Sequence, residues 1–174
     1  MEIIDSFLSE DECDFLIEYY EKYPIAKFGY SSTVILQMKD TSLFDLRNLW
    51  IRYRYLKKDT SLLSDLRKSW IRYFYLKRIQ KKFPLKLNYD QLVLWPPTSF
   101  KDMHNDGEFI KENDWTCVCY LNDDFEGGET LIEDKSIKPK KGTLVVFPSK
   151  KMEHGVSLVK GKSRYTYISW WKEK

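Results

Sequence analysis

The sequence is poor in nitrogen and sulfur ligands for metals, with only two histidines and three cysteines among its 174 residues. Three cysteines cannot all pair within one chain. Cys117 and Cys119 are two residues apart on an expected strand, which does not suit an ordinary disulfide. Free thiols are typical of a reducing compartment, so we expect a cytoplasmic protein.

Long apolar runs are also absent. No run approaches the roughly 18 residues of a transmembrane helix, so we expect no membrane contact. The opening stretch MEIIDSFLSEDECDFLIEYY is acidic and has no basic segment, which argues against a signal peptide. With 43% hydrophobic residues and no linker, the chain 1–174 is predicted to form a single domain with its own core.

Charge is unevenly distributed along the chain. Residues 39–82 contain thirteen Lys or Arg against four Asp, whereas the whole chain has a net charge of only +3. Such a basic segment favours an acidic partner, which leaves both polypeptide and nucleic acid open. The alternative is a solvated basic face on amphipathic helices.

An internal repeat occupies this basic segment. KDTSL occurs at 39–43 and again at 58–62, and DLRNLWIRYRYLK is followed by the similar DLRKSWIRYFYLK. Each copy opens with helix-capping residues and continues for about four turns without Gly or Pro. We therefore expect two helices joined by a short turn, one in each repeat copy (39–57 and 58–77).

The two halves of the chain differ in predicted secondary structure. Residues 6–23 predict an amphipathic helix in which Ser9 and Glu12 form a capping box. After Pro84 the chain consists of short β-rich runs separated by Gly, Asp, Asn and Pro: YDQLVLW, DWTCVCYLN, GETLIED, GTLVVFP and RYTYISWW. Such runs favour an antiparallel jelly-roll. The predicted fold class is α+β, with the helical residues 1–83 packed against a barrel of residues 84–174.

The stretch KDMHNDGEF (101–109) allows two interpretations. Counted from Asp102, it resembles an EF-hand calcium loop with Gly107 at the sixth position. However, the third position is His104 rather than Asp or Asn, and the twelfth is Asn113 rather than Glu. Adjacent prolines upstream also interrupt the helix that should enter such a loop. The calcium interpretation therefore fails at three points.

The second interpretation is a transition-metal site. On an extended backbone His104 and Asp106 project from the same face, and His154 follows beside Gly155. Two imidazoles and one carboxylate form the facial triad that binds iron(II) and leaves coordination positions open. Zinc accepts the same ligands, so ligand type alone leaves a zinc hydrolase open. Structural or solvated roles for the histidines are a further alternative.

The motifs around these residues resemble those of the iron(II) and 2-oxoglutarate-dependent dioxygenases, in the prolyl 4-hydroxylase-like branch. After MHND come DWTCVCYLNDDFEGGETLIE, KPKKGTLVVFPS and EHGVSLVKGKSRYTYISWW, in the order of that family. Upstream, DSFLSEDECDFLI resembles the family's opening helix and YDQLVLW its first barrel strand. The resemblance implies a double-stranded β-helix, which is a jelly-roll or cupin-like barrel.

The resemblance also implies roles for individual residues. His104, Asp106 and His154 would bind Fe(2+). Arg164, ten residues after His154, would pair with the distal carboxylate of 2-oxoglutarate. The hydroxyl of Tyr120 would help to hold the same carboxylate.

Two tryptophans are candidates for the active-site wall or for substrate contact. Trp170 shares the expected face of Arg164, although plain core packing is an equal alternative. Trp95 stands where the family usually has Tyr, and Thr98 stands where it usually has Gly. These departures bear on the substrate rather than on iron or 2-oxoglutarate.

The expected activity is hydroxylation of a peptidyl residue, with proline the first candidate, by O2 and 2-oxoglutarate with release of succinate and CO2. Ascorbate is a further candidate cofactor, and the expected partner is a peptide or protein. Two alternatives stay open. One is the same chemistry on a small molecule, a sugar or a nucleic-acid base, and the other is a non-catalytic binding module on the same fold.

Overall fold

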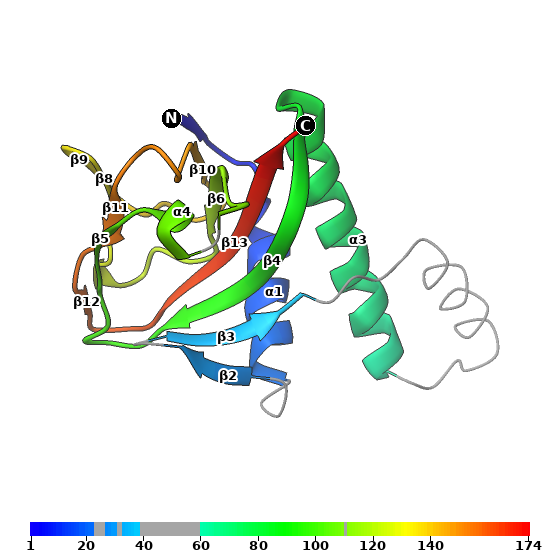
Figure 1. Ribbon diagram of the computed structural model, residues 1–174. Coiled ribbons are helices and arrows are strands. Elements are labelled where there is room, and N and C mark those ends of the chain that lie inside the picture. The colour runs from blue at the N-terminus through cyan, green and yellow to red at the C-terminus, as the bar shows by residue number, and fades with distance from the viewer. Residues whose placement is uncertain (23–26, 31–32, 39–59, 110) are drawn as a thin grey trace. The chain divides into compact units, whose positions relative to one another are not determined.

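The computed structural model describes residues 1–22, 27–30, 33–38, 60–109 and 111–174. The chain divides into two compact units. One unit consists of Met1–Met38 with Pro84–Lys174, and the other consists of Lys39–Phe83. The first unit contains all the described strands (Figure 1), and the second contains the described helix α3.

A seven-stranded antiparallel sheet forms the larger layer of the first unit. Its strands follow the order β1-β10-β6-β13-β4-β3-β2. Strand β13 is central and pairs with β4 from Arg164↔Trp95 to Glu173↔Leu85. The bounds are β1 Glu2–Ile4, β2 Lys27–Tyr30, β3 Thr33–Gln37, β4 Leu85–Trp95, β6 Trp115–Tyr120, β10 Leu144–Phe147 and β13 Arg164–Glu173.

A smaller antiparallel sheet faces the larger one. Its strand order is β5-β11-β8-β9, and β12 and β7 form a separate two-stranded sheet. The bounds are β5 Lys101–His104, β7 Glu126–Gly127, β8 Thr130–Ile132, β9 Lys135–Ile137, β11 His154–Val156 and β12 Val159–Lys160. Every β-rich run named from the sequence contains a strand of one of the two sheets, namely β4, β6, β8, β10 or β13. The predicted jelly-roll is therefore confirmed.

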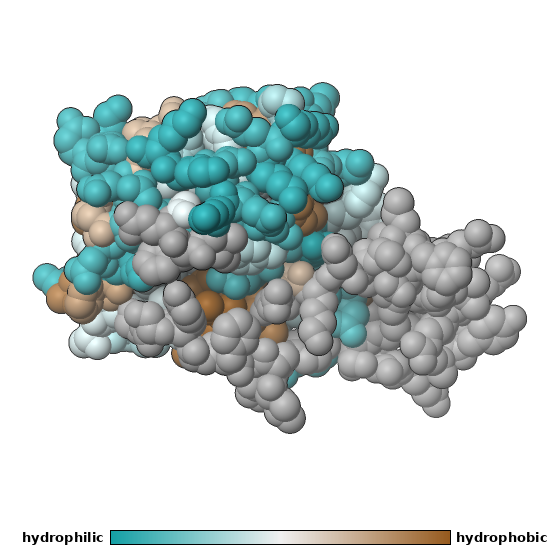
Figure 2. Space-filling model, in the orientation of Figure 1, coloured by the Kyte–Doolittle hydropathy of each residue, from teal (hydrophilic) through white to brown (hydrophobic). Residues whose placement is uncertain are grey.

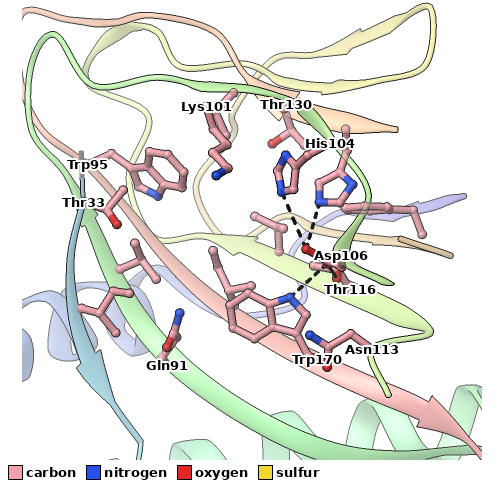
Figure 3. A pocket seen from close by; sticks show the side chains of 18 of the residues that line it. Thr33, Gln91, Trp95, Lys101, His104, Asp106, Asn113, Thr116, Thr130 and Trp170 are labelled. Carbon is pink, nitrogen blue, oxygen red and sulfur yellow. Dashed lines mark hydrogen bonds and ion pairs between the residues drawn. The ribbon is translucent and has the colours of Figure 1, made fainter. Parts of the chain in front are cut away.

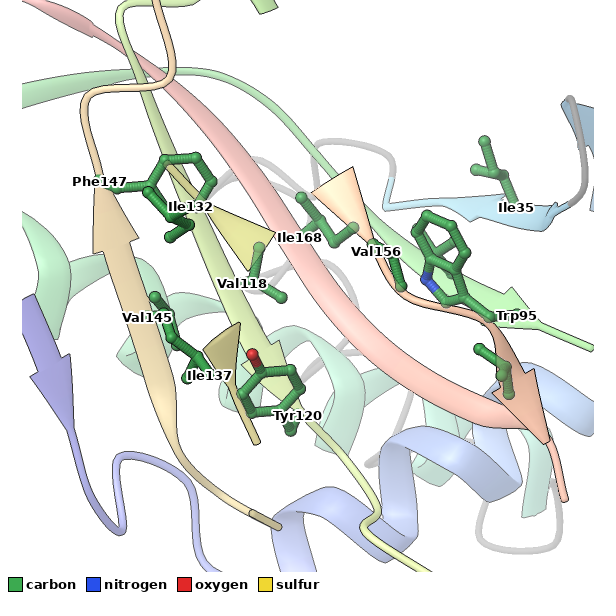
Figure 4. Packing of buried hydrophobic residues seen from close by; sticks show 12 residues of the cluster. Ile35, Trp95, Val118, Tyr120, Ile132, Ile137, Val145, Phe147, Val156 and Ile168 are labelled. Atoms are coloured by element: carbon green, nitrogen blue, oxygen red, sulfur yellow. The ribbon is translucent and has the colours of Figure 1, made fainter. Parts of the chain in front are cut away.

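The core lies between the two sheets (Figure 4). Val118, Phe147 and Ile168 come from the large sheet, and Ile132 and Val156 from the small one. All five are buried in a single cluster. This packing is what the alternation of apolar residues along the strands requires, because each sheet turns one face inward.

Helix α1 (Glu10–Lys22) covers the opposite face of the large sheet. The Tyr20 hydroxyl donates to the Val34 carbonyl at 2.9 Å, and the Tyr20 ring meets Tyr165 edge-on at 5.8 Å. The predicted capping box is present: Ser9 N donates to Glu12 Oε2 at 2.9 Å, and Glu12 N donates to Ser9 Oγ at 3.2 Å. The helix therefore begins at residue 10, later than the predicted residue 6.

Helix α3 (Thr60–Lys82) spans the second repeat copy, which confirms a helix there. Ile71, Tyr75 and Ile79 are buried at helical spacing. Trp70 and Phe74 are exposed, and their rings stack at 5.4 Å. The first copy (39–57) lies outside the described residues, so the expected pair of helices stays a prediction.

The described surface seen in Figure 2 is mostly hydrophilic, with smaller hydrophobic areas. Phe100 and Met103 are among the large apolar side chains that remain exposed. Among the described helices, none combines the length and the apolar character needed to cross a membrane.

Candidate active site

The two histidines are brought together by strand pairing. His154 on β11 lies directly opposite His104 on β5, and their ring centroids are 4.4 Å apart. Direct cross-strand partners have side chains on the same face of a sheet. The pairing of two short strands therefore joins residues that are fifty positions apart in the sequence.

Asp106 completes a cluster that can hold a metal ion. Its Oδ1 lies 3.7 Å from His104 Nε2 and 3.5 Å from His154 Nε2 (Figure 3). The ligand atoms of the three residues all lie within 4.8 Å of one another. The backbone differs from the extended one predicted, because β5 ends at His104 and Asp106 begins the short helix α4 (Asp106–Phe109). The carboxylate nevertheless turns toward the two imidazoles.

Backbone carbonyls fix which nitrogen of each imidazole faces the cluster. His104 Nδ1 lies 2.8 Å from the Asp102 carbonyl, and His154 Nδ1 lies 3.3 Å from the Met152 carbonyl. A carbonyl can only accept, so each Nδ1 carries the proton and donates it. Each Nε2 is then the nitrogen turned toward Asp106, and it is the nitrogen available to a metal.

The carboxylate of Asp106 is held in its charged form. Burial alone would raise its pKa, but hydrogen bonds from His104, His154 and Thr116 outweigh burial and hold the pKa well below its usual range. Asp106 is therefore an anion at neutral pH, as a metal ligand requires.

Arg164 is the buried cation of the site. It is 1% exposed, and its Cζ lies 5.0 Å from the centre of the Trp95 ring and 5.4 Å from that of Tyr120. One terminal nitrogen donates to Thr130 Oγ1 at 3.3 Å, whereas Nε and Nη1 find no hydrogen-bond partner in the described part of the chain. Burial lowers the pKa of Arg164 to about 10, so the group is still charged at neutral pH. A buried charge with unused donors is suited to bind an anion.

Tyr120 reaches Arg164 partly through a residue that the sequence did not single out. The Tyr120 hydroxyl donates to Thr130 Oγ1 at 2.6 Å, and the same oxygen accepts from Arg164. Thr130 lines the cavity of the site. The available signal was its place in the Gly-Gly-Glu-Thr motif. Gly128 in that motif has φ 63°, and a Cβ there would lie 3.0 Å from Arg164 Cδ, so the motif also makes room for the arginine.

The register of β13 agrees with the prediction. Lys162, a rival for the role of Arg164, lies on the surface, where its Nζ forms an exposed ion pair with Asp124 at 2.8 Å. Lys160 is exposed as well. Arg164 thus remains the basic residue of this segment that lines the cavity.

Both candidate tryptophans line the cavity. Trp95 donates from Nε1 to Thr166 Oγ1 at 3.2 Å. Trp170 donates from Nε1 to Asp106 Oδ2 at 3.0 Å, and its ring stacks on Tyr89 at 4.5 Å. Trp170 is therefore tied to the acidic member of the triad and is more than a core residue.

A cavity of about 510 Å³ is lined by the three cluster residues and by Arg164. Gln91 and Lys101 are among the polar side chains on its wall that did not emerge from the sequence (Figure 3). For Gln91 a signal existed, because Gln91 and Trp95 are four residues apart on β4 and share a face. Lys101 had no such signal, since β5 is short and its inward face was not predictable.

Comparison with known proteins gives a consistent result. The family model described as "2OG-Fe(II) oxygenase superfamily" matches residues 80–172, which is more than half of the chain. No curated protein matches the chain in sequence.

Solved structures share the fold at low sequence identity. A prolyl-4-hydroxylase from Pseudomonas putida is 20% identical with a TM-score of 0.66, and the match covers 99% of this chain and 92% of that one. A viral collagen prolyl hydroxylase from Paramecium bursaria Chlorella virus-1 is 22% identical with a TM-score of 0.63, and covers 99% and 95%. A Trichoplax adhaerens prolyl hydroxylase, solved with a hypoxia inducible factor peptide, is 14% identical with a TM-score of 0.69, and covers 99% and 83%.

The chain belongs to the 2OG-Fe(II) oxygenase superfamily. It is an Fe(II)/2-oxoglutarate-dependent dioxygenase with the fold of the prolyl hydroxylases, as the motifs had indicated. The family implies iron(II), 2-oxoglutarate and O2, and the site fits the first two. Two imidazole nitrogens and a carboxylate oxygen suit iron, and the unused donors of buried Arg164 suit a carboxylate.

Proposed function

We propose that the protein hydroxylates a peptidyl residue, with proline the first candidate, and that His104, Asp106 and His154 hold the iron. Arg164, supported by Tyr120 and Thr130, would bind the distal carboxylate of 2-oxoglutarate. Iron, 2-oxoglutarate and O2 together supply the oxidising power to convert a C–H bond into a C–OH bond, with succinate and CO2 as coproducts. The residues of the chain bind and orient the reactants and exclude water.

The observation that carries this proposal is that the triad and Arg164 line the same cavity. A metal ligand set without a nearby anion site would serve a hydrolase equally well. Arg164 distinguishes the two, because a fully buried guanidinium with unused donors is costly unless an anion joins it. A dicarboxylate that reaches from the metal to Arg164 meets that requirement.

A polypeptide substrate is supported by strand β5. Phe100, which precedes β5, and Met103 within it are 50% and 40% exposed. Strand β5 lies at the edge of its sheet, where an extended peptide can run beside it. Two of the similar structures are described as a collagen prolyl hydroxylase and as a hydroxylase with a bound peptide, which is consistent with this choice.

A small anionic molecule is the second candidate substrate. Lys101 points into the cavity beside Trp95 (Figure 3). An ammonium group on the cavity wall is a group that an anionic substrate can approach. An acidic residue beside the hydroxylated position of a peptide could approach it in the same way.

Three further expectations accompany the proposal. We propose ascorbate as a stimulant of turnover, a cytoplasmic location in keeping with the three free cysteines, and an acidic partner for the basic repeat segment 39–82. Ascorbate dependence can be measured directly as succinate formation with and without it.

The test is a substrate screen with the full chain. The protein is loaded with iron(II) and 2-oxoglutarate without O2, and is then exposed to O2 with proline-rich peptides, with the same peptides in which alanine replaces proline, and with small carboxylic acids. The expected result is a mass gain of one oxygen on a proline peptide, absent with the alanine peptide and with His154→Ala. Oxidation of a small acid alone would favour the second candidate. Failure of iron and 2-oxoglutarate to bind would overturn both.

A further inference from the structure

We propose that Trp170 and Thr116 hold Asp106 as a one-oxygen metal ligand and so keep a coordination position open for the cosubstrate. This inference rests on the proposed iron site. It assigns a positioning role to two residues that would act on the metal through Asp106.

The two oxygens of Asp106 have different surroundings. Oδ1 faces the imidazoles, at 3.7 Å from His104 Nε2 and 3.5 Å from His154 Nε2. Oδ2 accepts from Trp170 Nε1 at 3.0 Å and from the Thr116 hydroxyl. Two donors on one oxygen occupy its lone pairs, so Oδ1 is the oxygen left for a metal.

Ser149 fixes the direction of the Thr116 hydroxyl. Thr116 Oγ1 lies 2.7 Å from Ser149 Oγ, and both residues are buried. A hydroxyl has one proton, and a carboxylate can only accept, so Thr116 donates to Asp106 and Ser149 donates to Thr116. The Ser149 carbonyl also accepts from Asp106 N at 3.2 Å, which anchors the backbone of the same aspartate.

The Trp170 indole is held in place from its other side. Its ring lies nearly parallel to that of Tyr89, with 16° between the planes and 4.5 Å between the centroids. The Tyr89 hydroxyl accepts from Asn113 Nδ2 at 3.2 Å, and Asn113 Oδ1 accepts from Asn88 Nδ2 at 2.9 Å. The indole N–H is therefore a preorganised donor, in the same wall that Figure 3 shows beside Asp106.

The consequence concerns the number of open positions. Two imidazoles and one carboxylate oxygen leave three positions on the metal, whereas a carboxylate that binds through both oxygens leaves two. A chelating cosubstrate and O2 together need three. Removal of the donors to Oδ2 should therefore weaken metal binding and bring Oδ2 into competition with 2-oxoglutarate.

The experiment compares variants that keep shape but lose a donor. Trp170→Phe keeps an aromatic ring and removes the N–H, and Thr116→Val keeps the branched shape and removes the hydroxyl. Thr116→Ser retains the hydroxyl. Trp115→Phe is the matched control, because the Trp115 N–H donates at 3.1 Å to Glu173 at an exposed site. Each purified protein is titrated with Co(II), its absorption spectrum is recorded, and the Co(II)-loaded protein is titrated with 2-oxoglutarate.

Trp170→Phe and Thr116→Val are expected to weaken Co(II) binding roughly tenfold, to change the intensity of the Co(II) bands, and to weaken 2-oxoglutarate binding. Thr116→Ser and Trp115→Phe should resemble the unchanged protein. If Trp170→Phe also resembles Trp115→Phe, or if Co(II) affinity falls while the spectrum stays the same, the proposal is wrong. His154→Ala separates this failure from a failure of the iron site, because normal Co(II) binding by that variant would overturn the site itself.

Discussion

The two sides of the cavity differ in how their side chains are positioned and in how closely they match the motifs of the family. On one side, His104 and Asp106 are fixed by short-range contacts to backbone carbonyls and to Thr116, and they match the motifs of the family. Across the cavity, Thr33 and Gln91 come from β3 and β4 (Figure 3), where the sequence departs from the family at Trp95. Under the proposed function, the first side holds the metal and the second side faces the substrate. Substitutions on the two sides should then have separate effects.

The largest effect is expected at the metal side. His154→Ala removes one of three ligands while the protein stays folded, so iron binding and 2-oxoglutarate turnover should fall to background. Iron content and succinate formation measure the effect, and circular dichroism checks the fold. A folded variant with full activity and normal iron content would show that the metal is held elsewhere.

The next effect concerns the cosubstrate. Arg164→Ala should raise the KM for 2-oxoglutarate about ten- to hundredfold, because a charge-assisted hydrogen bond of about 1.5–3 kcal/mol is lost. Arg164→Lys should recover part of the affinity, since it keeps the charge without the forked geometry. Lys162→Ala is the matched control, because its partner Asp124 lies at the surface. A larger effect from Lys162 than from Arg164 would contradict the assignment.

Substitutions on the other side should leave the cosubstrate reaction intact. Gln91→Ala or Lys101→Met should slow hydroxylation of the true substrate about fivefold or more, as loss of one hydrogen bond of about 1 kcal/mol implies. Conversion of 2-oxoglutarate to succinate without substrate should change little. If either variant raises the KM for 2-oxoglutarate as Arg164→Ala does, the two sides are not separate.

The basic repeat should affect the arrival of the substrate rather than the reaction in the cavity. Deletion of residues 40–58, or Arg52→Gln with Arg54→Gln, should leave succinate formation without substrate near normal. Substrate turnover should fall, and more at low ionic strength, because salt screens steering by charge. Unchanged turnover at every salt concentration would show that the repeat is passive. Loss of succinate formation as well would mean that this segment supports the barrel.

The smallest effect is expected in the turn after Trp95. Thr98 has φ 73°, a left-handed conformation that strains a β-branched residue, and its N–H donates to the Val159 carbonyl at 2.8 Å. Thr98→Asn or Thr98→Gly should raise the free energy of unfolding by about 0.5–1 kcal/mol, since both residues tolerate this conformation better. Thermal unfolding measures the gain. An unchanged KM for 2-oxoglutarate would show that this departure from the family concerns stability rather than cosubstrate.

The sequence predicted what depends on local pattern. The capping box of Ser9 and Glu12 and the strands after Pro84 follow from spacing, and both are confirmed. Arg164 was indicated by the resemblance, and its side chain lines the cavity. The resemblance indicated which residues to examine together. Its motifs are far apart in the sequence, and strand pairing brings them close in the fold.

What the sequence missed depends on contacts between distant segments. Strands β2 and β3 (27–37) were not predicted, although β3 pairs with β4 and brings Thr33 to the cavity. Asp106 was expected on extended backbone, yet it begins a helix. The bond from Trp170 to Asp106 joins residues 64 positions apart, and no local pattern carries that information.

The direct pairing of His104 with His154 has a mechanical consequence. Strand β5 is four residues long and lies at the edge of its sheet, the kind of element that opens first in local unfolding. A metal ion bound to both histidines would fasten this edge to β11, because opening of the strand would require release of the ion. Opening of β5 and release of the metal would then be coupled. Each tenfold increase in the free metal concentration above its dissociation constant would add about 1.4 kcal/mol to the free energy of opening β5. The fold and its metal would hold the same edge closed.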